Sequence, residues 1–293
     1  MSCCRMRHPP AENLAQEASL ANPPAWISEN FTITPGGQHA DGRTENRLIC
    51  FRDGSYVELI AFVNDDAKNR EGHVWGDRQF GIIDFALAHS TGDASAVFSE
   101  LEKRLDAVKW KDGEVKVAYE PPKAGGRTRP DGIDVRWTVT QPKVDTGYQR
   151  GELPFFCHDI TPRSVRVPTC ERALTHPSGA YGVKQLTIYV PESRTETLPR
   201  AYAAIAGASD SMNKDFHGIL LERQVKITGT KDVRLVSQTP GEEWQLDAMR
   251  ERGGVFLGVL TFGAMVGPDG LESSRRMVDR QGGFGEIYLD QDR

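Results

Sequence analysis

Two glycine-rich stretches of the sequence echo each other and decide the fold. Residues 36–42 read Gly-Gly-Gln-His-Ala-Asp-Gly, and residues 125–132 read Gly-Gly-Arg-Thr-Arg-Pro-Asp-Gly, with one residue inserted. Both stretches are predicted to be turns, since glycine and Asp-Gly favour turns. The predicted strands that follow are Asn46–Phe51 and Ser55–Phe62 after the first stretch, and Ile133–Thr140 and Leu153–Ile160 after the second.

A second pair of similar segments lies in the same order along the chain. The segment His73–Gly76 precedes a predicted apolar strand at Ile82–Ala88, and the segment His176–Gly179 precedes another at Val183–Val190. A helix is predicted after each strand. The predicted helices are Asp93–Val108 and Glu192–Ile205. Two echoes in matching order predict a repeated βαβββ unit.

Local signals support the first of these units. Phe31–Pro35 is predicted to be a strand, and Asp53-Gly54 is a strong hairpin signal between the next two strands. In Ser55–Phe62, alternation places Glu58 on the same face as Tyr56 and Ile60.

The sequence resembles the glyoxalase-like domain family of the vicinal oxygen chelate superfamily. That superfamily includes glyoxalase I, bleomycin-resistance proteins and extradiol dioxygenases. The resemblance covers roughly residues 31–190. The stretches that carry it are Thr34–Asn46, Gly54–Phe62, Gly125–Gly132, Leu153–Phe156 and His176–Gly179.

The resemblance implies an α+β fold in which repeated βαβββ units form curved mixed sheets around a pocket. The strand expected before Phe31 is not evident, because residues 1–25 form a Pro-rich stretch without a sustained period. We therefore predict that the first unit lacks its first strand and that residues 1–25 are an irregular tail, with one short helix at Ala11–Leu20. Residues 26–170 would hold the paired units, and residues 171–293 a third, partial one.

The same resemblance implies metal ligands, usually His and Glu, on the first and last strand of each unit. Glu58 fits the last strand of the first unit. In the second unit Asp84-Phe85 occupies the place of an Asp-His pair, so a phenylalanine stands where histidine would bind the metal. The last strand offers Cys157 or His158. The resemblance thus implies an incomplete metal site with Glu58 as its one clear ligand.

Glu58 and His39 are the candidate catalytic residues. A carboxylate in a strand interior is costly to bury unless it is paired or coordinated, so Glu58 is expected at a pocket floor or paired with an arginine or a backbone donor. His39 follows the double glycine and either points into the pocket or hydrogen-bonds its own loop.

Three further residues are candidate ligand-binding groups. Arg127 and Arg129 flank Thr128, and guanidinium groups suit carboxylate or phosphate ends of a substrate, although a solvated loop would carry them equally well. His158 precedes Asp159 and is either an imidazole oriented by a carboxylate or a polar pair at the end of a strand.

Composition narrows the partners. The 293 residues include 36 Lys and Arg against 41 Asp and Glu, which gives a net charge of −5, and residues of both signs are interspersed along the chain. A nucleic-acid partner is not expected, because such proteins usually present a basic face. No apolar run approaches the length of about 20 residues that a membrane span needs. The five irregularly spaced cysteines and the lack of a signal peptide predict reduced thiols and a cytoplasmic protein.

Two functions of different class follow. The first is a protein that binds a small oxygenated molecule without a complete metal site, either as a monomer or as a homo-oligomer. The alternative is a metal-dependent lyase, isomerase or dioxygenase, in which a divalent metal ion is the cofactor and Glu58 binds it or moves a proton.

Overall fold

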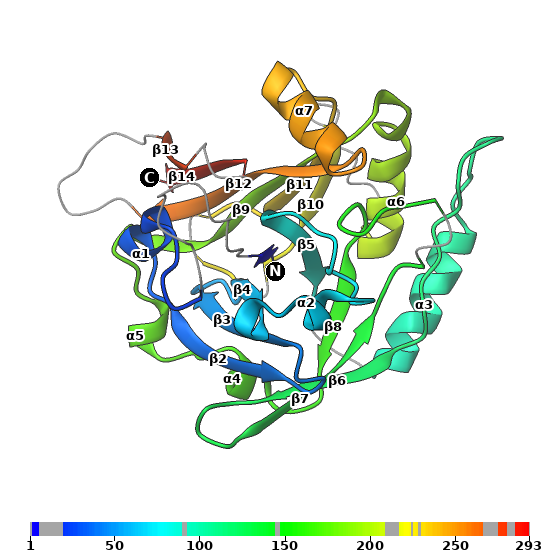
Figure 1. The fold of residues 1–293 in the computed structure, drawn as a ribbon. Helices are drawn as coiled ribbons and strands as arrows, with labels where there is room; N and C mark the ends of the chain where they lie inside the picture. The colour runs from blue at the N-terminus through cyan, green and yellow to red at the C-terminus, as the bar shows by residue number, and fades with distance from the viewer. Residues whose placement is uncertain are drawn as a thin grey trace.

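The fold is α+β and contains two mixed β-sheets (Figure 1). It was obtained as a computed structural model. The residues described are 2–5, 20–89, 93–143, 147–208, 217–223, 225–227, 230–265, 275–279 and 285–292. The first sheet closes into an eight-stranded barrel, and the second is an open sheet of six strands.

The barrel consists of two βαβββ units. The first contains β1 (Ser2–Arg5), α1 (Ala25–Asn30), β2 (Thr34–His39), β3 (Thr44–Cys50) and β4 (Tyr56–Phe62). The second contains β5 (Gly81–Leu87), α3 (Ala94–Asp106), β6 (Lys123–Thr128), β7 (Asp134–Thr140) and β8 (Phe155–Asp159). In each unit the first strand runs parallel to the last, and the other pairings within the unit are antiparallel.

The prediction that the first unit lacks its first strand is wrong. Ser2–Arg5 forms β1, which pairs in parallel with β4 and antiparallel with β5. The Ser-Cys-Cys-Arg sequence carries no apolar alternation, so nothing in its pattern marks a strand. Backbone pairing on both sides holds it in place instead. The helix predicted at Ala11–Leu20 falls almost wholly outside the described residues.

The two double glycines lie in strands rather than in turns, which corrects a second prediction. Gly36 and Gly37 belong to β2, Gly125 and Gly126 belong to β6, and the turns begin after these strands end. The reason is close approach. A Cβ on Gly36 would overlap the side-chain and carbonyl oxygens of Asn46. Glycine in a strand interior commonly marks such a contact.

The same glycine-rich strands join the two units. β2 pairs antiparallel with β6, and His39 lies opposite Arg127. On the other side β1 pairs with β5, so the barrel order is β1-β4-β3-β2-β6-β7-β8-β5. The Asp53-Gly54 hairpin between β3 and β4 is confirmed, with Gly54 at a φ of 80°.

The second sheet repeats this arrangement in reduced form. Its strands are β10 (Gly218–Leu221), β11 (Val233–Gln238), β9 (Ala180–Tyr189), β12 (Phe256–Met265), β14 (Glu286–Asp292) and β13 (Arg275–Asp279), in spatial order. The central pair β9–β12 is antiparallel, and each of these two strands is flanked by a parallel neighbour, β11 or β14. The other helices are η1 (Val63–Asp65), α2 (Ala67–Arg70), α4 (Arg163–Arg166), α5 (Glu171–Leu174), η3 (Glu192–Arg194), α6 (Thr197–Ala206) and α7 (Glu243–Glu251).

One large apolar core joins the barrel to the second sheet. It includes Leu59 of the barrel, Leu101 of α3, Tyr202 of α6 and Phe262 of the second sheet, all of them buried. A buried ion pair between Asp53 and Arg223 also connects the β3–β4 hairpin to the second half of the chain. Within the described residues, no helix is long and apolar enough to cross a membrane.

The close approach at Gly36 can be tested by mutation. Replacing Gly36 with alanine should lower the free energy of unfolding by about 2 kcal/mol, because the new methyl group overlaps Asn46. Urea denaturation of the wild type and the variant measures the difference. Gly241→Ala is the control, since the nearest atom to a Cβ there is 3.9 Å away. Equal stability losses in the two variants would contradict the role assigned to Gly36.

Candidate functional site

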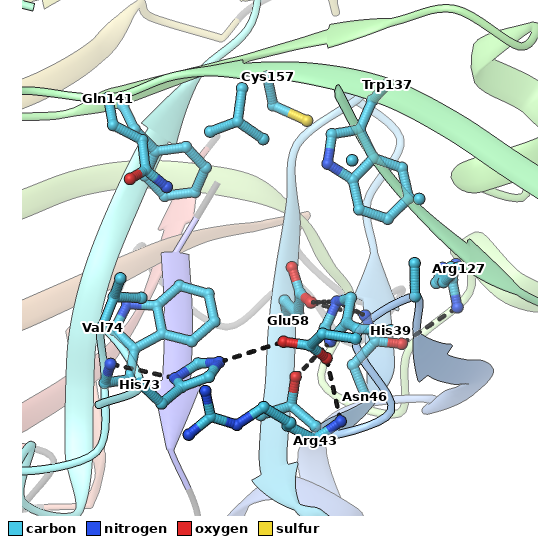
Figure 2. A pocket seen from close by; sticks show the side chains of 18 of the residues that line it. His39, Arg43, Asn46, Glu58, His73, Val74, Arg127, Trp137, Gln141 and Cys157 are labelled. Carbon is cyan, nitrogen blue, oxygen red and sulfur yellow. Dashed lines mark hydrogen bonds and ion pairs between the residues drawn. The ribbon is translucent and has the colours of Figure 1, made fainter. Parts of the chain in front are cut away.

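The barrel encloses a cavity of about 520 Å³. That size lies within the usual range for a small-molecule site. Its walls come from both βαβββ units and from the segment that follows β4 (Figure 2). The residues that line it include His39, Asp41, Arg43, Asn46, Leu48, Tyr56, Glu58, His73, Val74, Trp75, Arg127, Trp137, Val139, Gln141, Arg150, Phe155, Cys157 and Arg166.

The two units contribute different side chains to the cavity. In the first unit Leu48 lies opposite Glu58, and in the second Val139 lies opposite Cys157, and all four line the cavity. Glu58, Asn46 and His39 form a polar wall, and the second unit adds the apolar side chains of Trp137, Val139 and Phe155. Figure 2 shows Trp137 and Cys157 across the cavity from Glu58 and Asn46.

Glu58 forms the centre of the polar wall. It is buried on β4, and its Oε1 accepts a hydrogen bond of 2.6 Å from Nδ2 of Asn46. Nε2 of His39 lies 3.4 Å from the same oxygen, while Nδ1 of His39 bonds the hydroxyl of Thr44 at 2.7 Å. Both sequence-based alternatives for His39 thus hold, because the ring bonds its own hairpin and also lines the cavity.

Asn46 connects the polar wall to the seam between the units. Its Oδ1 accepts from the backbone N–H of Gly37 and from Nη1 of Arg127, each at 3.1 Å. Its Nδ2 donates to Glu58. One buried amide therefore bonds β2, β6 and β4 together, and the absence of a side chain at Gly36 leaves the room that it occupies.

The surroundings of Glu58 favour its charged form. Burial alone would raise its pKa, but the hydrogen bond and charge of His39, the amide of Asn46 and the charge of Arg127 outweigh that effect and lower the pKa. Arg127 is itself only 4% exposed, and burial lowers the pKa of its guanidinium. The expected solvated loop around Arg127 is not what the structure shows.

Cys157 contacts Arg166, and all three guanidinium nitrogens of this arginine donate hydrogen bonds. Arg166 donates through Nε and Nη2 to both oxygens of Asp159, at 2.5 and 2.9 Å, and through Nη1 to Tyr56 and to the Cys157 sulfur. Burial nevertheless raises the pKa of the Cys157 thiol to about 11. The thiol is therefore protonated near neutral pH and is a poor nucleophile.

Asp84 forms a buried ion pair with a second arginine, Arg150. Its Oδ2 accepts from Nε of Arg150 at 2.5 Å and from Nε1 of Trp75 at 3.2 Å, and its Oδ1 accepts from the backbone N–H of Phe85. Phe85, at the place where the resemblance implied a histidine ligand, packs in the apolar core against Tyr202.

The segment after β4 covers one side of the cavity. Nε of Arg43 donates to the carbonyl of Asn69 at 3.0 Å, and Nε2 of His73 lies 3.7 Å from Asp41. Val74 is 54% exposed although it lines the cavity, so it stands at the mouth. These contacts attach the segment to the β2–β3 hairpin.

Two predicted binding residues do not reach the cavity. Arg129 bonds the carbonyl of Val165 and pairs with Asp131. His158 follows Cys157 on β8, so it faces the opposite side of the strand, where its ring stacks on Phe156. The structure brings together Glu58, His39 and Arg127 but leaves Arg129 and His158 outside.

Sequence reasoning also missed several residues of the site. Strand alternation could have found Asn46 and Trp137, because each shares a strand face with another lining residue, Leu48 or Val139. Arg150 lies in an irregular segment, where no periodic signal exists.

The donor set does not fit a divalent metal ion. Among the described side chains, no group of three or more His, Cys, Asp or Glu residues could hold one. Glu58 is bonded to Asn46, Asp84 is paired with Arg150, and the sulfur of Cys157 accepts from Arg166. Asp84 and Cys157 thus contact guanidinium groups, and Glu58 contacts an amide, where a metal site would need donors that are free to converge on the ion.

Comparison with known proteins identifies the family. The family model described as "Glyoxalase-like domain" matches residues 18–205, more than half of the chain. The chain therefore belongs to the glyoxalase-like domain family, as the sequence resemblance implied. No curated protein matches.

Three solved structures are similar to this chain at low sequence identity. A hypothetical protein from Staphylococcus aureus superposes with a TM-score of 0.58 at 13% identity, over 89% of this chain and 90% of that one. A fusion protein of a xylose isomerase-like TIM barrel and 4-hydroxyphenylpyruvate dioxygenase gives 0.46 at 9% identity, over 92% of this chain and 46% of that one. A variant of 4-hydroxymandelate synthase from Streptomyces coelicolor gives 0.37 at 11%, over 81% and 64%.

The lowered pKa of Glu58 makes a prediction about stability and pH. Because its pKa in the folded state is below the ordinary 4.5, ionised Glu58 stabilises the fold fully above that pH. This contribution should be lost as the pH falls from 4.5 through the folded-state pKa. Denaturation of the wild type and of Glu58→Gln at pH values from about 3 to about 7 gives their free energies of unfolding. The difference between these two free energies should disappear at low pH. Glu45→Gln, at an exposed position on β3, is the control. A difference that stays constant across this range would contradict the assignment.

Proposed function

We propose that this glyoxalase-like protein binds a small oxygenated molecule in the barrel cavity and does so without a resident metal ion. The observation that carries the proposal is the state of Glu58. Its carboxylate is bonded to Asn46 and lies beside His39, while the cavity in front of it is large enough for a small ligand.

Glu58 and His39 are proposed to contact the polar end of the ligand. Both contacts within the wall fall on Oε1 of Glu58, which leaves Oε2 to accept from a hydroxyl or N–H group of the ligand. His39 offers Nε2 on the same side. Arg127 is proposed to hold this pair in place through Asn46. The apolar surfaces of Trp137 and Val139 would receive the rest of the molecule.

A metal-dependent lyase, isomerase or dioxygenase is the alternative, and the geometry supports it less. Its acid–base version needs a carboxylate whose pKa lies near the working pH. The pKa of Glu58 is shifted downward, which makes it a weaker base than an ordinary glutamate. Its metal-binding version needs convergent donors, and those of the described side chains are already bonded to arginine or asparagine.

Titration with metal ions separates these functions. Isothermal titration with Zn²⁺, Mn²⁺ and Ni²⁺ should give weak binding that Glu58→Gln does not change, because one carboxylate alone holds a divalent ion weakly. Tight binding of one ion per chain that disappears in Glu58→Gln would restore the enzyme hypothesis.

A thermal-shift screen of small oxygenated molecules tests the binding itself. Molecules that stabilise the wild type should lose most of that effect in Glu58→Gln and His39→Ala, since both side chains line the cavity. The matched control is His158→Gln, on the opposite face of β8. Ligands that stabilise all four proteins alike would place the binding site elsewhere.

A further inference from the structure

Arg150 is the arginine of the cavity wall with the most unused hydrogen-bonding capacity. Its side chain is 8% exposed, and among the described residues it makes one hydrogen bond, from Nε to Asp84. Nη2 is buried and has no partner. A buried donor without an acceptor costs free energy, so such groups usually mark a missing partner.

The other arginines of the cavity are more fully used. Arg166 donates through all three nitrogens to Asp159, Tyr56 and Cys157. Arg127 donates through both Nη atoms, to Asn46 and to the carbonyl of Arg166.

Arg43 donates through Nε and Nη2 to the backbone carbonyls of Asn69 and Glu71. At Arg150 neither Nη atom has a hydrogen bond among the described residues, but Nη2 is fully buried, so a ligand in the cavity can reach at most Nη1. A guanidinium N–H donor suits an oxygen of a carboxylate.

The surroundings of Arg150 are aromatic. The centre of its guanidinium lies 5.7 Å from the ring centroid of Trp75 and 5.6 Å from that of Phe155, and both rings line the cavity. Trp137 and Val139 continue this apolar wall. A flat apolar body that enters here would pack on these side chains while its charged end meets the arginine.

The arginines of the cavity differ in how completely their donors are used. Four arginines line the cavity (Arg43, Arg127, Arg150 and Arg166) with two acidic residues (Asp41 and Glu58), and Asp84 and Asp159 pair with Arg150 and Arg166. Asp84 contacts Arg150 through Nε, so Nη1 of Arg150 keeps its donors for an acceptor on a ligand.

We propose that the molecule bound in the cavity is a carboxylate with an aromatic or conjugated body, and that its carboxylate pairs with Nη1 of Arg150. This inference rests on the proposed binding function and adds the chemical class of the ligand. Glu58 and His39, on the polar wall, would then meet a hydroxyl or carbonyl group elsewhere on the same molecule.

Matched acid and amide probes test the proposal. Benzoate and cinnamate, with benzamide and cinnamamide as neutral counterparts, are titrated into the protein while tryptophan fluorescence and ligand-observed NMR are recorded. In the wild type the acids should bind about tenfold or more tightly than the amides, as expected for a charged hydrogen-bonded pair.

Three variants locate the effect. Asp84→Asn combined with Arg150→Gln removes both charges, so that no buried carboxylate is left alone, and the preference for acids should vanish. Arg150→Lys keeps the positive charge but loses the Nη1 donor, and should show a smaller preference. Arg129→Lys, outside the cavity, should behave as the wild type. If the double variant does not fold, the comparison of wild type, Arg150→Lys and Arg129→Lys still decides.

The outcomes separate the two proposals. Amides that bind as tightly as acids, or acid binding that Arg150→Lys leaves unchanged, would overturn the carboxylate assignment while the binding function stands. If no probe binds the wild type and the thermal-shift screen also yields no cavity ligand, both proposals are overturned.

Discussion

The structure depends on the pairing of two glycine-rich strands, β2 and β6, which joins the two βαβββ units. A side chain at Gly36 would occupy the place of the Asn46 amide, and one at Gly125 would lie 2.7 Å from Nε1 of Trp137. Gly36 and Gly125 therefore allow the barrel to close and leave room for the side chains of Asn46 and Trp137. The β2–β6 pairing and the cavity both depend on these two glycines.

Asn46 shows how that constraint reaches the site. A buried amide can satisfy both of its ends only where donors and acceptors already converge. Here the strand pairing brings Gly37 and Arg127 to its oxygen and Glu58 to its nitrogen. Asn46 and His39 contact the carboxylate of Glu58, and these contacts offset the free-energy cost of burying its charge. This arrangement supports the proposal that the wall receives a polar group of a ligand rather than a metal ion.

The sequence predicted the family, the repeat and the hairpin at Asp53-Gly54 because each depends on local patterns. It placed Glu58 correctly by alternation, yet it assigned Gly36 and Gly125 to turns, since glycine signals a turn and a close strand contact alike. β1 was missed because pairing on both sides, rather than side-chain pattern, defines it. Arg150 was missed because its contact with Asp84 joins positions that lie 66 residues apart in the sequence.

The last strands of the two units carry different chemistry into the cavity. Glu58 of β4 is a carboxylate beside His39, whereas Cys157 of β8 is a protonated thiol that contacts Arg166. With Glu58 and Asn46 on one wall and Cys157 and Trp137 on the other, the two walls would contact different ends of one molecule. This difference supports the proposed binding of a ligand with one polar end rather than of a metal ion.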